Sequence, residues 1–443
     1  MDKKTIVWKL ICGIVIVAAA VLLLSGVLNN HDVRYHTQAL TRESLTKLSA
    51  KAPDALAYDG TINAAAWKDV FPYIASSMDD NGKNDEIVDY LAQDPYLVNI
   101  YEGYGFAKEY GSARGHSYTL EDVHHTARPH ATANCLTCKT PNFAKLVQDK
   151  GVEAYTYDFE EVWTQIHEQG EAVSCYTCHG NSAGDGGELR VTHSYVNKAL
   201  GANLQTINPG TLSCGQCHIE YYFTPADKET MMPYGSVEAM TPEAILEYYD
   251  SMVLPDGSVG FSDWTQPSTG AKMLKAQHPE METYLQGKHA AEGLNCADCH
   301  MEIKMNDDGT VYHSHELVSP LDSPSILESC AKCHGDTNMV QFVHRIQDQV
   351  TTREKEIGNK LSAFKDALAD ANKAFEEGAP GARTEDELNA IRKLYREAQW
   401  FFDFDYVENA EGAHNSALAN RCLDLAAERI AKGMSLLGIE NLD

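Results

Sequence analysis

The residues best placed to do chemistry are five pairs of cysteines, each separated by two residues and followed at once by a basic side chain. The basic residue is lysine after the first pair and histidine after the other four. Two thiols at this spacing can add to the vinyl groups of a haem, and the adjoining histidine can then bind its iron. The five motifs are Cys135, Cys138 and Lys139; Cys175, Cys178 and His179; Cys214, Cys217 and His218; Cys296, Cys299 and His300; and Cys330, Cys333 and His334.

Other uses of paired cysteines fit less well. Histidine accounts for only 18 of 443 residues, so four chance repeats of C-x-x-C-H are not expected. Zinc ribbons need no histidine directly after the second thiol, and five pairs would leave one without a partner. A disulfide framework is typical of short secreted domains rather than of a chain of this length. We therefore predict five covalently bound haem c groups.

Lys139 marks the first motif as the centre with a different role. A haem with two strong axial ligands transfers electrons, whereas a haem with one ligand leaves a position for substrate. An amine binds iron only when deprotonated, which burial beside a metal makes feasible. The alternative is that Lys139 neutralises a haem propionate. Fourteen of the 18 histidines lie outside the motifs, so counting alone cannot choose the second axial ligands.

The N-terminus carries a targeting signal. Lys3, Lys4 and Lys9 precede an uncharged run over residues 10–28. This pattern is typical of a secretory signal, and the run is also long enough to span a bilayer. We expect residues 1–28 to be a signal peptide or an uncleaved signal-anchor, which places the remainder in the periplasm or otherwise outside the cytoplasm. The net charge of −28 argues against a nucleic-acid partner.

The rest of the chain divides into segments that differ in amino-acid composition and hydrophobic pattern. Residues 29–50 are predicted to be a linker, and residues 51–336 hold every motif among short polar, Gly- and Pro-rich runs. Residues 337–443 have a helical pattern and are predicted to form a C-terminal dimerisation region. We predict a mainly α protein: a multihaem cytochrome c domain with little β structure, followed by long C-terminal helices.

Three helices are expected in this C-terminal region. Apolar residues recur every three or four positions over residues 343–375, which predicts one long amphipathic helix. Thr384 with Glu387 forms a capping box for a second helix, and a third covers about residues 413–437. The near-heptad seam of the first helix favours a partner helix, either in the same chain or across a dimer.

The order of the motifs, one C-x-x-C-K and then four C-x-x-C-H, resembles the ammonia-forming pentahaem cytochrome c nitrite reductases. Segments at residues 114–116, 214–223, 261–265 and 275–279 also look like this family, and the resemblance covers about residues 94–414. It implies six-electron reduction of nitrite to ammonium at a Lys-ligated haem fed by four bis-His haems. It also implies a homodimer that takes electrons from a membrane tetrahaem quinol dehydrogenase or a soluble multihaem cytochrome.

The resemblance further implies roles for individual residues. Three would line the distal pocket of the first haem: Arg128, Tyr221 and His278. Four would be distal axial ligands: His315 for the second haem, His116 for the third, His414 for the fourth and His289 for the fifth. A calcium ion would be held by the carboxylate of Glu220, the backbone carbonyls of Tyr221 and Lys275, and the side chain of Gln277. Such all-oxygen ligation suits Ca²⁺.

Two other functions remain open. His124, His125 and His130 crowd the pocket arginine, and one of them on the active iron would occupy the substrate position. The protein would then be an electron-transfer cytochrome without a substrate site. A related reductase acting mainly on hydroxylamine or sulfite is the other alternative.

Overall fold

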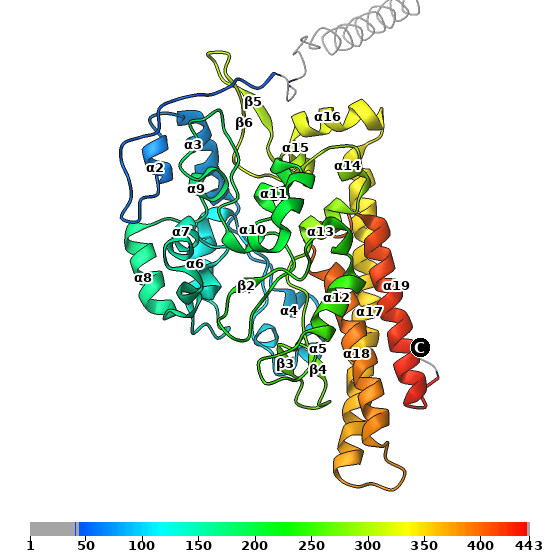
Figure 1. Ribbon diagram of the computed structural model, residues 1–443. Coiled ribbons are helices and arrows are strands. Elements are labelled where there is room, and N and C mark those ends of the chain that lie inside the picture. Colours follow the sequence, from blue (N-terminus) through cyan, green and yellow to red (C-terminus); the bar gives the residue numbers. More distant parts are fainter. Residues whose placement is uncertain (1–39, 41–43, 441–443) are drawn as a thin grey trace, which may run out of the picture.

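The computed structural model describes residue 40 and residues 44–440. A broad body of short helices and loops carries three long helices along one side (Figure 1). The predicted signal segment, residues 1–28, and most of the predicted linker lie outside the described residues. Over the ranges that the structure describes, no helix is both long and apolar enough to cross a membrane.

Helices dominate the body, and most of them are short. Those before the long C-terminal helices are α2 (Ala64–Trp67), α3 (Pro72–Asp79), η2 (Asp80–Lys83), α4 (Tyr90–Gln93), α5 (Tyr96–Ile100), η3 (Gly105–Ala107), η4 (His116–Tyr118), α6 (Thr119–His124), η5 (Ala133–Leu136), α7 (Pro141–Lys150), η6 (Gly151–Thr156), α8 (Phe159–Gln169), α9 (Cys175–His179), α10 (Ser194–Leu200), η7 (Gly201–Thr206), α11 (Pro209–Cys214), η8 (Val237–Ala239), α12 (Pro242–Ser251), α13 (Glu280–Leu285), α14 (Lys288–Ala291), α15 (Cys296–His300), η9 (Pro320–Asp322) and α16 (Pro324–His334).

The strands of the described chain form three small antiparallel pairs. They are β1 (Tyr222–Phe223) with β2 (Thr230–Met231), β3 (Trp264–Thr265) with β4 (Lys272–Met273), and β5 (Ile303–Met305) with β6 (Val311–His313). Each pair is a local hairpin rather than part of a larger sheet. The prediction of a mainly α fold with little β structure is confirmed.

The C-terminal helices begin and end close to the predicted positions. They are α17 (Met339–Glu376), α18 (Glu385–Tyr406) and α19 (Ser416–Leu436). The predicted capping box is confirmed, because Thr384 and Glu387 exchange hydrogen bonds at the start of α18. Asn338 caps α17 through its side chain, which accepts a hydrogen bond from the backbone of Gln341.

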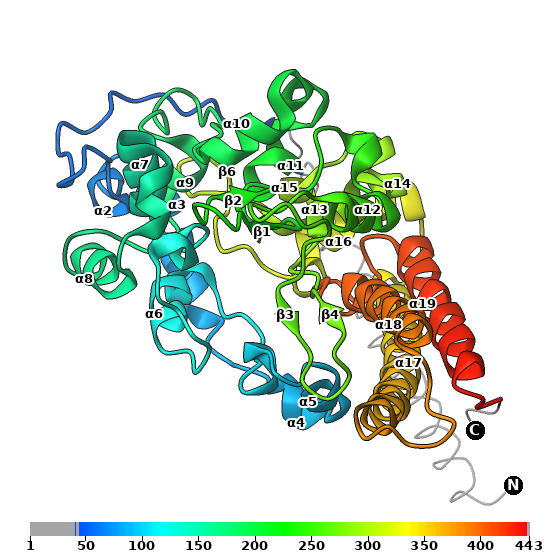
Figure 2. The same ribbon diagram turned by 60° about the horizontal axis from the view of Figure 1, so that its bottom comes forward.

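The predicted seam of α17 is packed largely within the chain. Ile357, Leu361, Phe364 and Leu368 are buried in a large hydrophobic core shared with α18 and α19. Helix α5 and the β3–β4 hairpin pack against the same helices, as the view in Figure 2 shows. Gln266, in the turn of that hairpin, links α5 to α18 by donating hydrogen bonds to the Ile100 carbonyl and the Tyr395 hydroxyl. The long helices therefore form part of the body's own core.

A second, smaller hydrophobic cluster surrounds the first cysteine pair. Leu136, Phe143, Tyr155 and Phe159 are fully buried there, on η5, α7, η6 and α8. The first motif is thus held by its own core, apart from the core of the long helices.

Candidate active site

Each cysteine pair lies at the beginning or end of a helix, where residues three and four positions apart share one face. The second and fourth motifs are themselves short helices, α9 and α15, and capping boxes that start at Ser174 and Asn295 close their N-termini. The third pair starts at the end of α11, the fifth at the end of α16 and the first in η5. The ten thiols are free and none is fully buried.

Four pairs of histidines from distant parts of the chain lie close together. Their ring centroids are separated by 6.4 Å for His179 and His315, 6.2 Å for His116 and His218, 6.1 Å for His300 and His414, and 6.1 Å for His289 and His334. Two imidazoles that bind one metal ion from opposite sides, with nitrogens about 2 Å away, have centroids about 6 Å apart. The spacing of all four pairs fits an iron between the rings.

Hydrogen bonds orient several of these rings. His179, His300 and His315 donate from Nδ1 to backbone carbonyls at 2.9, 3.1 and 2.9 Å. A ring that donates through Nδ1 keeps its Nε2 lone pair for a metal. Burial lowers the pKa of His300 and of His315 to about 4, so both imidazoles are neutral at pH 7. Neutral imidazole is the form that binds a metal.

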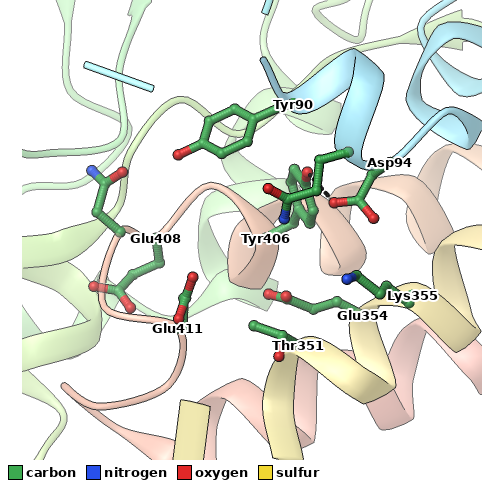
Figure 3. Close-up of a pocket in the computed structure, with 10 residues that line it drawn as sticks. Tyr90, Asp94, Thr351, Glu354, Lys355, Tyr406, Glu408 and Glu411 are labelled. Atoms are coloured by element: carbon green, nitrogen blue, oxygen red, sulfur yellow. Dashed lines mark hydrogen bonds between the residues drawn. The ribbon is translucent and has the colours of Figure 1, made fainter. Parts of the chain in front are cut away.

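His414 has a carboxylate partner instead of a carbonyl. Its Nδ1 is hydrogen-bonded to Glu408, which raises the pKa of His414 to about 9 although burial opposes this. Glu408 lines an acidic pocket between α4, α17 and the end of α18 (Figure 3). Glu354 and Glu411 are turned toward the same space. This pocket lies beside the predicted ligand of the fourth haem and does not include the predicted distal residues of the first.

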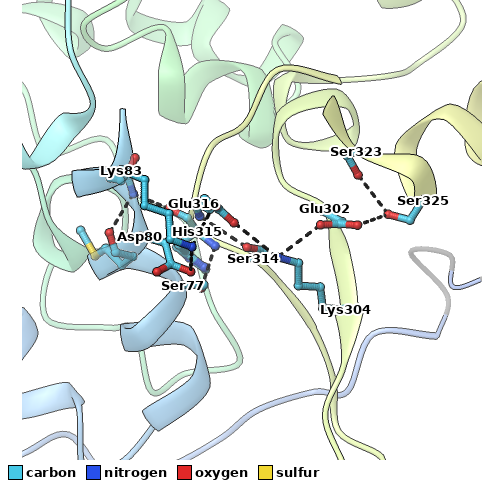
Figure 4. Close-up of polar contacts among 12 residues, drawn as sticks. Ser77, Asp80, Lys83, Glu302, Lys304, Ser314, His315, Glu316, Ser323 and Ser325 are labelled. Carbon is cyan, nitrogen blue, oxygen red and sulfur yellow. Dashed lines mark hydrogen bonds and ion pairs between the residues drawn. The ribbon is translucent and has the colours of Figure 1, made fainter. Parts of the chain in front are cut away.

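The loop that carries His315 is held by a network of polar contacts (Figure 4). The His315 backbone N–H donates to the Ser77 hydroxyl at 2.9 Å, and Asn81 donates to the His315 carbonyl at 2.6 Å. The Lys304 ammonium lies 3.3 Å from Glu302 and 3.4 Å from Glu316, on either side of the β5–β6 hairpin. These contacts fix the hairpin and its histidine against α3 and η2.

Lys139 lies between η5 and α7, where its carbonyl accepts a hydrogen bond from the Thr119 hydroxyl at 2.8 Å. Within the described ranges, its side chain makes no hydrogen bond or ion pair. It is half-buried and close enough to lower the pKa of the Cys138 thiol, together with larger contributions from other neighbours. Its amine is therefore not paired with a carboxylate among the described residues.

Arg128 sits on the short loop before the first motif. Its guanidinium carbon lies 4.4 Å from the centroid of the Phe106 ring, and its Nε donates to the Thr126 hydroxyl at 3.0 Å. Burial raises the pKa of the Tyr221 hydroxyl, and the charge of Arg128 acts in the opposite direction. The Tyr221 ring lies 5.6 Å from that of His278. The structure thus brings all three predicted distal residues into one region.

The predicted calcium ligands also lie together. Glu220 is fully buried, and its carboxylate accepts hydrogen bonds from the Gln277 backbone at 2.6 Å and from the Tyr249 hydroxyl at 3.0 Å. The Gln277 side chain lies 2.9 Å from the Lys275 carbonyl. Burial raises the pKa of Glu220 well above its usual range. A buried carboxylate, a backbone carbonyl and a side-chain amide close together are the types of group that fit Ca²⁺.

The three histidines near Arg128 are engaged elsewhere. His124 stacks on Trp163 with centroids 3.8 Å apart, and its Nε2 lies 3.2 Å from Glu160. His125 donates to the Glu121 carbonyl at 3.0 Å. His130 donates from Nδ1 to the Arg128 carbonyl at 3.0 Å, so it supports the arginine loop.

Sequence reasoning missed two carboxylates in this region. Glu408 is bonded to His414, and Glu280 lies 4.0 Å from His218 Nδ1 and 3.5 Å from His278 Nδ1. Neither occurs at a spacing that marks a motif. The one available signal was the position of Glu280, two residues after His278.

Comparisons with known proteins identify relatives of this chain. Residues 63–439 match the family model of cytochrome c552. The chain is similar to the solved catalytic subunit of cytochrome c nitrite reductase from Desulfovibrio desulfuricans, which has two calcium sites; identity is 29% over 85% of this chain and 86% of that one, with a TM-score of 0.75. The outer cell wall cytochrome OcwA gives 17% identity, 71% and 48% coverage and a TM-score of 0.38. An undecahaem S-layer cytochrome of Carboxydothermus ferrireducens is 16% identical over 73% of this chain and 41% of that one, with a TM-score of 0.37.

Proposed function

The chain belongs to the cytochrome c552 family, and on this premise we propose that it is an ammonia-forming cytochrome c nitrite reductase. The observation that carries the proposal is the set of five cysteine pairs, four with paired histidines and one with an uncommitted lysine. The similar enzyme from Desulfovibrio desulfuricans supports nitrite as the substrate. Reduction of nitrite to ammonium requires six electrons and eight protons at one site.

The residues fit five haem c groups held through the ten motif thiols. Haem c, when bound, supplies the iron at which nitrite is reduced and the relay for its electrons. Lys139 would hold the first haem, and the four histidine pairs would hold the others. The ring spacing of about 6 Å supports these assignments.

Three side chains would handle the substrate. Arg128 attracts the nitrite anion and donates hydrogen bonds to its oxygens. His278 donates protons as the N–O bonds break. Tyr221 donates a hydrogen bond to the bound nitrogen species, because burial keeps its hydroxyl protonated. The Nε2 atoms of His124 and His130 lie 3.2 and 3.8 Å from the Glu160 carboxylate, which supports leaving the substrate position to nitrite.

The motifs that would hold the first and third haems lie next to each other. The Cys138 thiol contacts that of Cys217, and the Cys214 thiol contacts that of Cys296. The first, third and fourth motifs are therefore contiguous. Haem groups held in these motifs would supply electrons close to the nitrite site.

Calcium, partners and location complete the proposal. Glu220, Tyr221, Lys275 and Gln277 would hold Ca²⁺ and so stiffen the segments that present the pocket. The protein would act outside the cytoplasm as a homodimer, supplied by a membrane tetrahaem quinol dehydrogenase or a soluble multihaem cytochrome. Because the α17 seam is packed within the chain, the dimer would use another face of the C-terminal helices.

The decisive experiment measures the products formed from nitrite with a reduced viologen dye. We expect about one ammonium per nitrite and no release of nitric oxide. Hydroxylamine and sulfite serve as competing substrates, and an Arg128→Ala variant should show a raised KM for nitrite. Absence of ammonium from a preparation with five haems would contradict the proposed function.

A further inference from the structure

A single buried carboxylate lies between the predicted proton donor and a predicted ligand of the neighbouring haem. Glu280 Oε2 is 3.5 Å from Nδ1 of His278, and Glu280 Oε1 is 4.0 Å from Nδ1 of His218. Glu280 is only 7% exposed. The ring centroids of the two histidines are 5.9 Å apart, so both rings contact the same carboxylate.

The first turn of α13 holds this carboxylate in place. The backbone N–H of Met281 donates to the His218 carbonyl at 3.1 Å. Glu282 accepts a hydrogen bond from the Glu220 backbone at 2.8 Å. Three consecutive residues of α13 therefore dock on the segment that runs from the third motif to the predicted calcium ligand. A negative side chain in the first turn is also favoured by the helix dipole.

Glu280 has one further partner, which comes from the C-terminal helices. The Asn409 side chain donates a hydrogen bond to Glu280 Oε1. Asn409 follows Glu408, the carboxylate bonded to His414. The loop between α18 and α19 thus supports the carboxylates at both histidines, His218 through Glu280 and His414 through Glu408.

The other predicted haem ligands show what a partner at Nδ1 does. In His179, His300 and His315 a backbone carbonyl accepts the Nδ1 proton, and the ring is left to bind through Nε2. Such partners fix the tautomer and the ring orientation, and a carboxylate partner also makes the imidazole a stronger donor to the metal. Glu280 lies beside Nδ1 of both His218 and His278, at ion-pair distances of 4.0 and 3.5 Å rather than in a hydrogen bond.

An alternative role for His218, His278 and Glu280 is to hold a metal ion, because their ligand atoms lie within 4.8 Å of one another. That use conflicts with the proposed pairing of His218 and His116, whose ring centroids are 6.2 Å apart, because this pairing would commit His218 Nε2 to a haem. Nδ1 of His218 is then left to face Glu280, which lies 4.0 Å away.

We propose that Glu280 is a positioning residue that orients His278 for proton delivery and tunes the third haem through His218. The inference rests on the proposed function and goes beyond it, because it joins the proton donor of the active site to the haem that supplies its electrons. Neither role requires Glu280 to contact nitrite.

The test compares holoenzyme carrying Glu280→Gln with wild type. The change keeps the size of the side chain and removes its charge. We expect kcat for nitrite to fall about tenfold, the range seen when partners of metal-bound histidines are removed. KM should stay within about twofold, because anion binding depends on Arg128. The ferric electron paramagnetic resonance signal of the third haem should shift, and its midpoint potential should become more positive.

A His116→Met variant identifies which signal belongs to the third haem. Glu247→Gln removes a charge from an exposed site on α12 and should alter neither kinetics nor spectra. Asn409→Ala provides a second route if Glu280→Gln fails to fold, and we expect smaller changes of the same kind in both measurements.

Each outcome decides the inference. An unchanged kcat in Glu280→Gln would overturn the positioning of His278, and an unchanged signal of the third haem would overturn the link to His218. The spectroscopic measurement does not depend on turnover. A wild-type protein without nitrite activity would therefore contradict the proposed function while leaving the Glu280–His218 contact open to test.

Discussion

His300 and His414 lie with their ring centroids 6.1 Å apart and their planes at 80°, although one belongs to the fourth motif and the other to the loop before α19. The C-terminal region therefore supplies one of the two rings proposed to bind the fourth haem. Since α18 and α19 also bury Leu394, Trp400 and Leu423 in the main core, the packing of these helices sets the position of His414. We therefore expect the stability of the helical region and ligation of the proposed fourth haem to be coupled.

Replacing Lys139 with histidine should leave haem content unchanged, because Cys135 and Cys138 form the covalent bonds. Nitrite turnover should fall at least about tenfold, or about 1.4 kcal/mol on the barrier, since the axial ligand controls haem reactivity. Pyridine haemochrome assay and steady-state kinetics provide the two measurements. Lys150→His, on the exposed end of α7, is the matched control. Unchanged kinetics in Lys139→His would show that Lys139 is not the ligand of the active iron.

Removal of calcium should lower both thermal stability and turnover, because the Glu220 carboxylate and the Lys275 carbonyl would lose the cation proposed to hold their segments together. A ligand present at one hundred times its Kd stabilises the folded state by about 2.7 kcal/mol. The melting temperature should therefore fall on treatment with a chelator and recover when Ca²⁺ is added. Gln277→Ala should require more Ca²⁺ for the same recovery, whereas Gln349→Ala on the exposed face of α17 should not. Equal melting curves with and without chelator would contradict a calcium site.

Features that depend on local sequence patterns were predicted correctly. Contacts between residues far apart in the sequence could not be predicted from such patterns. The motif cysteines and the Thr384–Glu387 cap were identifiable because their chemistry depends on spacings of three or four residues. The pairing of His116 with His218 spans about one hundred positions, and only the family resemblance suggested it. Glu280 and Glu408 could not be identified from the sequence, since a carboxylate beside a histidine ring depends on how α13 and the α18–α19 loop pack. The same limit applied to His124, whose stacking on Trp163 links two helices.

Stability should depend on pH through Asp405. This carboxyl is 4% exposed, and one of its oxygens has no hydrogen-bond partner among the described residues. Burial, with Glu408 adding to it, raises the pKa of Asp405 to about 8. The unfolded carboxyl ionises near pH 4, so between about pH 4 and 8 the folded state keeps a proton that the unfolded state releases. Folding stability is therefore lost as pH rises, by up to about 1.4 kcal/mol per pH unit.

Replacing Asp405 with asparagine removes this dependence. The melting temperature of Asp405→Asn relative to wild type should increase steadily from pH 5 to pH 8. Asp370→Asn, at an exposed position of α17, should give no such trend. A constant difference across this range would show that Asp405 ionises normally in the folded protein.

Gly433 should resist substitution by alanine although it lies inside α19. In most helices this change stabilises by about 1 kcal/mol. Here a Cβ at position 433 would lie 2.0 Å from the Phe364 ring of α17, so the two helices would have to separate. Overpacking of this kind costs about 1–3 kcal/mol. We expect Gly433→Ala to lower the melting temperature, whereas Ser435→Ala on the exposed face should not lower it.

A double variant tests the cause of this effect. Phe364→Leu alone should destabilise the protein by leaving space in the core. Combined with Gly433→Ala, it should cost less than the sum of the two single changes, because the leucine leaves room for the new methyl group. Additive losses would mean that the α17–α19 contact does not limit position 433. A change in the spectrum of the fourth haem in Gly433→Ala would show that the packing of α19 also affects the position of His414.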